Sequence, residues 1–264
     1  MYTIVLATQK GGSGKSTLAI GLGLAARQAG HTVRLVETDP QATLSRWQSR
    51  RGEGDPLVER FTNAHGLEQR LKSLRESGVT LTIIDTASGL SAVTTAAIRH
   101  ADLCLIPARP SIADIEATAL TVSMARACKT PFAFILNQTP IRGQRINNAA
   151  TALSDEAASD LAGVVAQPLI AMRNDHQDAL AAGLAVSEYA PTGKSAGEVQ
   201  KLWQWVDTKL TGRAAVIEDG VGETTGCPHP ALPVEAVAEA GAEPETAMPL
   251  PAWSEASVPS PKFA

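Results

Sequence analysis

Short apolar segments alternate with longer segments of helical apolar spacing from the N-terminus to about residue 210. Several of the apolar segments are continuous and rich in β-branched residues, which is typical of strands buried on both faces of a parallel sheet. The predicted strands are Thr3–Ala7, Val33–Val36, Leu81–Ile84, Leu103–Ile106, Phe132–Leu136 and Val164–Ala166. The predicted helices are Lys15–Ala29, Ala42–Arg50, Leu67–Ser77, Ala92–His100, Ile112–Cys128, Asn147–Leu161 and Glu198–Leu210.

This alternation predicts an α/β fold, a doubly wound and mostly parallel sheet with helices on both faces. In such folds the loops that follow the carboxyl ends of the strands meet at one edge of the sheet, and ligands bind there. The residues that directly follow the predicted strands are therefore the first candidates for a functional site.

Charge and proline content divide the chain into two unequal parts. The 264 residues carry a net charge of −4, but residues 214–264 hold eight acidic residues and a single basic one, Lys262. The same segment holds 8 of the 16 prolines and has little apolar periodicity, a composition typical of disorder. We therefore expect one mildly basic folded domain over residues 1–211 and a disordered, acidic, Pro-rich tail over residues 212–264.

Other features bear on the compartment. No apolar run reaches the roughly 18 to 20 residues that cross a bilayer, and the N-terminus shows no signal-peptide pattern. The three cysteines, Cys104, Cys128 and Cys227, are widely spaced and suggest neither a disulfide framework nor a metal cluster. We expect a cytoplasmic protein without a membrane partner.

The segment TQKGGSGKST, residues 8–17, lies between the first predicted strand and the first predicted helix. Its glycines let backbone N–H groups converge on phosphate oxygens, and the following helix N-terminus adds a favourable dipole. Lys15 can then reach the β- and γ-phosphates of a nucleotide, and Ser16 can bind Mg²⁺. This strand–loop–helix context favours a phosphate-binding P-loop over an incidental glycine-rich turn.

Two carboxylates follow other buried strands. Asp39 could orient an attacking water or support a metal shell, although an aspartate before Pro40 is also common in simple turns. Asp85 ends the segment LTIID, the Walker B pattern, and could bind Mg²⁺ directly or through a water. The small residues 86–88 follow it, near where a γ-phosphate would lie.

Asn137 ends the fifth predicted strand and could read a base edge with its amide group. Residues 137–140 read NQTP, so they lack the N-K-x-D pattern of guanine-specific P-loop proteins. The expected cofactors are therefore ATP and Mg²⁺ rather than GTP.

The segment from Lys10 to Ser16 matches in full the K-G-G-x-G-K-[ST] loop of the deviant Walker A ATPases, the ParA/MinD superfamily. The segments ETDPQATLSRW, IIDTASGLSAVTTAAIRHADLCLIPARPS, ILNQ and VSEYAPTGKSAGEVQKLW also resemble small plasmid-type ParA partition ATPases. The resemblance covers roughly Met1 to Leu210. It implies a P-loop NTPase fold, and weak ATP hydrolysis that a partner stimulates.

The resemblance also implies a role for each matching residue in a sandwich dimer that forms on ATP binding. Lys15 would bind phosphate within its own subunit, and Lys10 would reach the phosphates of the partner. Asp39 would position the hydrolytic water, Asp85 would serve the Mg²⁺ site with Ser16, and Asn137 would contact adenine. The full nucleotide-binding set is Gly11, Gly12, Ser13, Gly14, Lys15, Ser16, Thr17 and Asn137. Glu37 stands where many relatives have aspartate, and we expect this longer acid to change little.

The ATP-bound dimer is implied to bind nucleoid DNA non-specifically, and a ParB-like activator is implied to stimulate hydrolysis and release. Loose positional resemblance suggests three DNA contacts: Arg173, Lys194 and Lys201. Lys194 belongs to a second Gly-Lys-Ser sequence, but no buried strand leads into it, so it predicts a loop that enters a helix. The charges of this segment fit a solvated helix face as well as a nucleic-acid patch.

Partition of plasmid or chromosomal DNA is the first functional hypothesis. A ParA-like ATPase that positions a protein cargo, such as carboxysomes or chemoreceptor clusters, is an alternative, since only the partner would differ. A MinD-like membrane-positioning ATPase needs a basic amphipathic C-terminal helix, which the acidic tail does not offer. An Fe–S member of the superfamily needs cysteines placed together, which the wide spacing disfavours.

Overall fold

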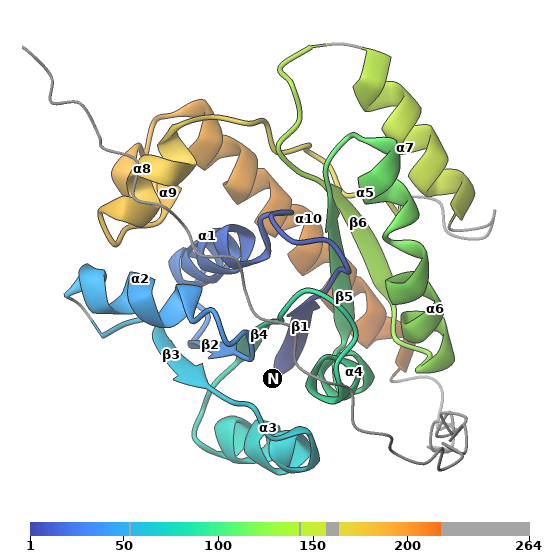
Figure 1. The fold of residues 1–264 in the computed structure, drawn as a ribbon. Helices are drawn as coiled ribbons and strands as arrows, with labels where there is room; N and C mark the ends of the chain where they lie inside the picture. The colour runs from blue at the N-terminus through green and yellow to red at the C-terminus, as the bar shows by residue number, and fades with distance from the viewer. Residues whose placement is uncertain (53, 143, 157–163, 218–264) are drawn as a thin grey trace, which may run out of the picture. The chain divides into compact units, whose positions relative to one another are not determined.

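The computed structural model describes residues 1–52, 54–142, 144–156 and 164–217 (Figure 1). Its centre is a six-stranded sheet in the order β3-β2-β4-β1-β5-β6, in which neighbouring strands pair in parallel. The strands are β1 Tyr2–Leu6, β2 Val33–Glu37, β3 Leu57–Arg60, β4 Leu81–Asp85, β5 Leu103–Ala108 and β6 Phe132–Leu136. The predicted doubly wound parallel sheet is therefore confirmed.

Helices cover both faces of this sheet (Figure 1). Ile4 and Leu6 of β1 join a core with α1, α2 and α10, whereas Val5 joins a second core with α3, α4 and α6, because successive strand residues point to opposite faces. The helices are α1 Lys15–Gln28, α2 Thr43–Arg51, the 3₁₀ helix η1 Ala64–Gly66, α3 Leu67–Glu76, α4 Ala92–Arg99, α5 Ile112–Glu116, α6 Ala119–Ala127, α7 Gln144–Glu156, α8 Asp175–Ala181, α9 Val186–Tyr189 and α10 Lys194–Ile217.

Two strand predictions differ from the structure. Strand β3 at the sheet edge has no predicted counterpart, because Leu57–Arg60 is short, carries two charged residues and is not fully buried. The predicted strand Val164–Ala166 forms only an isolated bridge, in which Val165 pairs with Phe134. The predictions succeed for β4, β5 and β6, where every residue is buried.

The helix predictions err mainly where polar groups interrupt a periodic segment. The single helix predicted over Ile112–Cys128 is divided into α5 and α6, and the Thr118 hydroxyl donates to the Ile115 carbonyl at the break, at 2.7 Å. The helix predicted over Asn147–Leu161 is α7, whose described part ends at Glu156. The short helices η1, α8 and α9 have no predicted counterpart.

Helix α10 extends past the predicted domain boundary at residue 211 and continues to Ile217. The remainder of the predicted tail, residues 218–264, lies outside the described residues, so its disorder stays a prediction. Among the described helices, none combines the length and apolar character that a membrane crossing requires.

The register of the sheet brings three strand ends together. Leu6 at the end of β1 pairs with Asp85 at the end of β4, and Glu37 at the end of β2 pairs with Asp85 from the other side. The P-loop after β1, the segment after β2 and the carboxylate at the end of β4 therefore meet at one edge of the sheet, as the topology predicts.

Candidate functional site

The P-loop enters α1 without a side-chain cap. Gly14, the N-cap residue, has φ 89° and ψ 22°, and the first turn of α1 holds no acidic residue. The first N–H groups of the helix and the positive end of its dipole are therefore free of a competing carboxylate. A helix start of this kind favours a phosphate group.

Side chains from the end of β6 hold the loop in place. Asn137 Nδ2 donates to the Ser13 carbonyl and Gln138 Nε2 donates to the Gly12 carbonyl, each at 2.8 Å. A Cβ atom on Gly14 would lie 2.2 Å from Asn137 Nδ2, so no other residue fits there without a shift. Asn137 thus braces the loop, a role that the sequence did not suggest.

Lys15 is 6% exposed and lies under the segment that follows β4. Its Nζ donates to Ser88 Oγ at 3.3 Å. Burial lowers the pKa of Lys15, and the nearby negative charges of Asp85 and Asp39 oppose this shift. The ammonium group therefore lies near two groups of opposite charge beside the loop, and its phosphate role stays a prediction.

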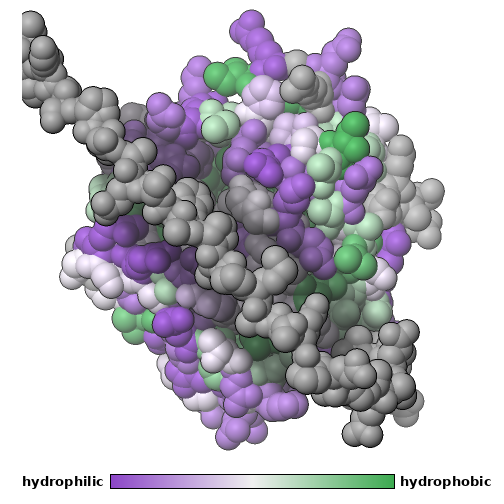
Figure 2. All heavy atoms as spheres, in the orientation of Figure 1, coloured by the Kyte–Doolittle hydropathy of each residue, from purple (hydrophilic) through white to green (hydrophobic). Residues whose placement is uncertain are grey.

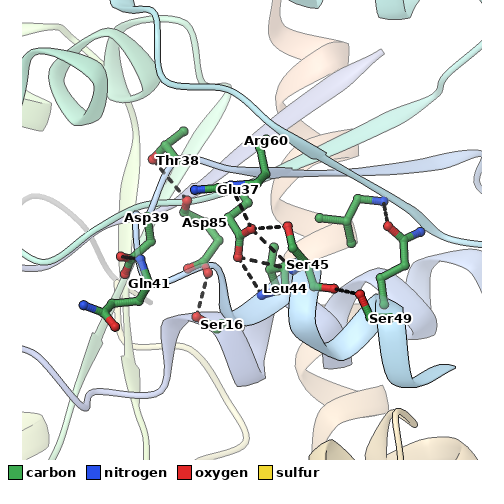
Figure 3. Close-up of polar contacts among 12 residues, drawn as sticks. Ser16, Glu37, Thr38, Asp39, Gln41, Leu44, Ser45, Ser49, Arg60 and Asp85 are labelled. Carbon is green, nitrogen blue, oxygen red and sulfur yellow. Dashed lines mark hydrogen bonds and ion pairs between the residues drawn. The ribbon is translucent and has the colours of Figure 1, made fainter.

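Ser16 and Asp85 form the second polar centre of the site (Figure 3). Ser16 Oγ donates to Asp85 Oδ2 at 2.6 Å. Burial raises the pKa of Asp85 to about 7, and the neighbouring charges of Asp39 and Glu37 act in the same direction, whereas the Ser16 hydrogen bond and Lys15 oppose it. Asp85 Oδ1 is buried and has no hydrogen-bond partner among the described residues.

These atoms fit a magnesium ion. A buried carboxylate oxygen without a partner, next to a hydroxyl, is the kind of hard oxygen set that Mg²⁺ prefers. The described residues hold no group of three or more His, Cys, Asp or Glu side chains that could bind a metal alone. Mg²⁺ usually retains waters and takes further oxygens from a nucleotide, so Ser16 and Asp85 suffice as its protein ligands.

The segment after β2 carries two acids with different surroundings (Figure 3). Asp39 is half-buried, and its Oδ1 accepts a hydrogen bond from Gln41 N at 2.8 Å. Glu37 is fully buried and accepts hydrogen bonds from the first turn of α2, including one from Leu44 N at 2.6 Å. Asp39 is therefore the acid with access to solvent, as a residue that orients water must be.

Lys10, in the first part of the P-loop, is close enough to α5 for its charge to act on that helix. Burial raises the pKa of Asp114 in α5, but hydrogen bonds from Arg109 and Ser111 and the positive charges of Arg109 and Lys10 lower it below its ordinary value overall. The ammonium group of Lys10 therefore acts on Asp114 of its own chain. The predicted role of Lys10, contact with the phosphates of a partner subunit, stays a prediction.

A small pocket of about 100 Å³ opens beside the P-loop. Its lining includes Gly14, Thr17, Asn137, Met172, Arg173 and His176. Met172 is 70% exposed and offers an apolar surface to a flat ring. The predicted contact of Asn137 with adenine stays a prediction, but Asn137 and Thr17 do line the same pocket.

The three predicted DNA contacts differ in availability. Arg173 is half-buried and forms a two-pronged ion pair with Glu198, at 2.6 and 2.7 Å. Lys194 and Lys201 are exposed on α10, two helical turns apart on one face. The geometry therefore gives Arg173 a structural partner and leaves the two lysines accessible.

Three site residues had no role assigned from the sequence: Glu37, Ser88 and Gln138. Each acts through a contact with a distant segment, namely α2, Lys15 and Gly12. Their positions at or shortly after the ends of β2, β4 and β6 were the available signal, since loops at the carboxyl ends of strands form the site in this fold class.

Comparison with known proteins identifies the relatives of the chain. The family model for the CobQ/CobB/MinD/ParA nucleotide binding domain, CbiA, matches residues 4–221. Maintenance of carboxysome distribution protein A of Halothiobacillus neapolitanus is 27% identical over 204 residues, covering 75% of this chain and 92% of that protein. Protein ParA of Rhizobium radiobacter is 33% identical over 118 residues, 43% of this chain and 51% of that protein.

The fold has solved counterparts. The septum site-determining protein MinD of Pyrococcus horikoshii, solved with Mg-ADP, superposes with a TM-score of 0.63 at 20% identity, covering 80% of this chain and 98% of that one. At this identity the likeness supports the fold. Since the family model spans most of the chain, and the P-loop of the family is present in full, the chain belongs to the CobQ/CobB/MinD/ParA family of nucleotide-binding ATPases.

Proposed function

We propose that this chain is a Mg²⁺-dependent ATPase that positions a cargo in the cell as an ATP-controlled dimer. The observation that carries the proposal is the Ser16–Asp85 pair, with its 2.6 Å hydrogen bond and its unpartnered buried oxygen among the described residues. This pair lies at the same edge of the sheet as buried Lys15 and the uncapped start of α1.

Each residue then has a defined task. When bound, Mg-ATP would supply the phosphoanhydride bond and a cation that stabilises charge on the leaving phosphate. Ser16 and Asp85 would hold the cation, and Lys15 would neutralise phosphate charge. Asp39 would orient the attacking water, because it combines a free carboxylate edge with partial access to solvent.

The dimer is supported by what surrounds Lys10. The positive charge of Lys10 lowers the pKa of Asp114, so this lysine lies within electrostatic range of α5. On the same chain Ile112 is 76% exposed and Ile141 is 73% exposed, and Figure 2 shows apolar residues at the surface near α5, α6 and α7. Apolar side chains that gather on one surface can mark a site where a partner binds.

A protein cargo is the first candidate for what the dimer moves. The Halothiobacillus relative, by its name, maintains carboxysome distribution, and its match covers most of both chains. DNA partition with a ParB-like activator is the second candidate, supported by the shorter match to Protein ParA. Both readings include non-specific DNA binding by the ATP-bound dimer, for which Lys194 and Lys201 are the accessible candidates.

A DNA-retention assay with parallel measurement of ATP turnover tests this proposal. Retention on non-specific duplex DNA is measured with ATP, ADP and a non-hydrolysable ATP analogue, each at two salt concentrations. We expect retention only with ATP or the analogue, and a steep loss at the higher salt, because phosphate contacts release counterions. Lys194→Ala combined with Lys201→Ala should weaken retention and leave basal turnover unchanged.

Two results would count against it. Retention that is the same with every nucleotide removes the ATP control. Absence of any Mg²⁺-dependent ATP turnover removes the ATPase itself. The cargo is decided separately: deletion of the gene should raise plasmid loss if the cargo is DNA, and should leave plasmid loss unchanged if the cargo is a protein assembly.

A further inference from the structure

Helix α2 begins without a cap of its own. Its N-cap residue, Ala42, is in the left-handed region with φ 54° and ψ 41°, and has no side chain that could accept a hydrogen bond. A helix start leaves several backbone N–H groups without partners, and these normally need a side-chain acceptor or water.

Glu37, at the end of β2, supplies the missing acceptor (Figure 3). Its Oε1 accepts from Leu44 N at 2.6 Å, and its Oε2 accepts from Ser45 N at 3.3 Å. The Ser45 hydroxyl donates a further short hydrogen bond to Oε2. The carboxylate therefore occupies the place of an N-cap side chain, although it comes from a neighbouring strand.

The burial of this carboxylate shows how completely it depends on the helix. Its side chain has 0% exposure, and Arg60, whose Nε lies 3.8 Å away, is itself 54% exposed. Burying a charge is costly unless hydrogen bonds compensate for lost water. Here the first turn of α2 and its dipole provide most of that compensation.

The segment between Glu37 and α2 is the one that carries Asp39. Thr38 N donates to the Asp85 carbonyl at 2.9 Å, and Ala42 N donates to the Asp39 carbonyl at 3.1 Å, which closes a tight turn. One end of this turn continues from β2 and the other end leads into α2. Glu37 links the end of β2 to the start of α2, so it holds the turn between them, which carries Asp39.

We propose that Glu37 is a positioning residue for hydrolysis, which ties the start of α2 to the end of β2 and so holds Asp39 in place. The inference deepens the proposed function and rests on the role of Asp39 in it. Many relatives were expected to have aspartate here, and the difference now has a physical meaning. An aspartate is one methylene shorter, so it would fall short of Leu44 N and Ser45 by roughly one bond length.

The test compares Glu37→Asp with wild type, with Glu37→Gln, and with Glu59→Asp as a matched control. Glu59 lies on the neighbouring strand β3 and pairs with Arg70 of α3 rather than with the first turn of α2. Two quantities are measured: amide hydrogen exchange at Leu44 and Ser45 in the nucleotide-free protein, and kcat against the ATP dissociation constant. A melting curve for each variant confirms that it is folded.

For Glu37→Asp we expect about tenfold faster exchange at both amides, because their acceptor is lost. We also expect kcat to fall about tenfold or more with ATP affinity changed less than about twofold, since a displacement near 1 Å is enough for such a loss. Glu37→Gln keeps the length and should lose less in both measurements. Glu59→Asp should match wild type in both.

Unchanged kcat in Glu37→Asp overturns the inference, as does a variant in which turnover and ATP affinity fall together. A larger loss in Glu37→Gln than in Glu37→Asp also overturns it, because the charge and not the reach would then matter. If the wild-type protein binds ATP but does not hydrolyse it, the proposed function fails; the exchange data would then still decide whether Glu37 tethers α2.

Discussion

At the scale of single residues, the P-loop depends on contacts from other strand ends. Gly14 combines φ 89° with an approach of 2.2 Å between its missing Cβ and Asn137 Nδ2. Gly12 has a similar φ of 72°, but nothing lies within 4 Å of its missing Cβ. A side chain at Gly12 would therefore meet only an unfavourable backbone conformation, whereas a side chain at Gly14 would also collide with Asn137.

Gly14→Ala should weaken Mg-ATP binding about a hundredfold, because the methyl group must displace Asn137 and with it the brace on the Ser13 carbonyl. Gly12→Ala carries only the left-handed strain of about 1 to 2 kcal/mol and should weaken binding about tenfold. Isothermal titration calorimetry measures both. Equal losses in the two variants would show that the contact with Asn137 has no effect. Gly14→Ala combined with Asn137→Ala should recover part of the affinity.

Residues within a local motif were predictable, and residues that act across the fold were not. Lys15, Ser16 and Asp85 lie where the P-loop and strand-end patterns place them, and Ser16 and Asp85 are in direct contact. The donation from Asn137 to Ser13 joins residues 124 positions apart, which no local pattern encodes. Glu37 was expected to change little, yet its extra methylene is what reaches Leu44 N.

At the scale of elements, α2 is held at both ends. Glu37 caps its start, and at its middle Trp47 Nε1 donates to the Leu184 carbonyl at 3.1 Å. In the last turn Arg51 forms a two-pronged ion pair with Glu188 of α9, at 2.6 and 2.5 Å, and lies over the Trp47 ring. Helix α2 therefore links the Asp39 turn to the segment that leads into α10.

Arg51→Ala should lower the free energy of unfolding by about 2 to 3 kcal/mol, since it leaves Glu188 partly buried without its partner. Burial alone would raise the pKa of Glu188, but hydrogen bonds from Arg51 and from Ala185 N lower it. A carboxylate with a lowered pKa stabilises the folded state above its unfolded pKa, near 4.3, and loses this effect as the pH falls through the folded value.

The difference in the free energy of unfolding between wild type and Arg51→Ala should therefore be largest at neutral pH and should become smaller in acid. Urea denaturation at several pH values measures it. Arg50→Ala is the control, because the neighbouring Arg50 is exposed and forms no ion pair with a described residue, only a hydrogen bond to the Leu180 carbonyl. A difference that stays constant from neutral pH into acid would rule out the ion pair as its source.

Elements were predictable where one physical cause dominated. The central strands are apolar because both of their faces are covered, so composition alone locates them. Strand β3 is stabilised by its ladder to β2 rather than by burial, and its polar composition hides it. At the break between α5 and α6 the Thr118 hydroxyl donates to the Ile115 carbonyl, a contact that helical periodicity does not register.

At the scale of the whole molecule, the candidate nucleotide site has one P-loop lysine, Lys10, for which we propose no role within its own subunit. Lys15, Ser16 and Asp85, which make the contacts of this site, are proposed to bind phosphate and Mg²⁺, while the charge of Lys10 acts on Asp114. A second copy of the chain is the simplest user of such a lysine, and the exposed Ile112 and Ile141 offer apolar surface for it. ATP would then control assembly, and hydrolysis would reverse it.

The molar mass in solution, measured by light scattering after size exclusion, tests this claim most directly. The variant Asp39→Ala should bind ATP without hydrolysing it. This variant and the double variant Asp39→Ala with Lys10→Ala are each measured with Mg-ATP and with Mg-ADP. Lys72→Ala, a lysine of α3, is the matched control for the second substitution. We predict a dimer with Mg-ATP, a monomer with Mg-ADP, and a loss of the dimer only when Lys10 is replaced. The same mass with both nucleotides, or a dimer that persists without Lys10, would contradict it.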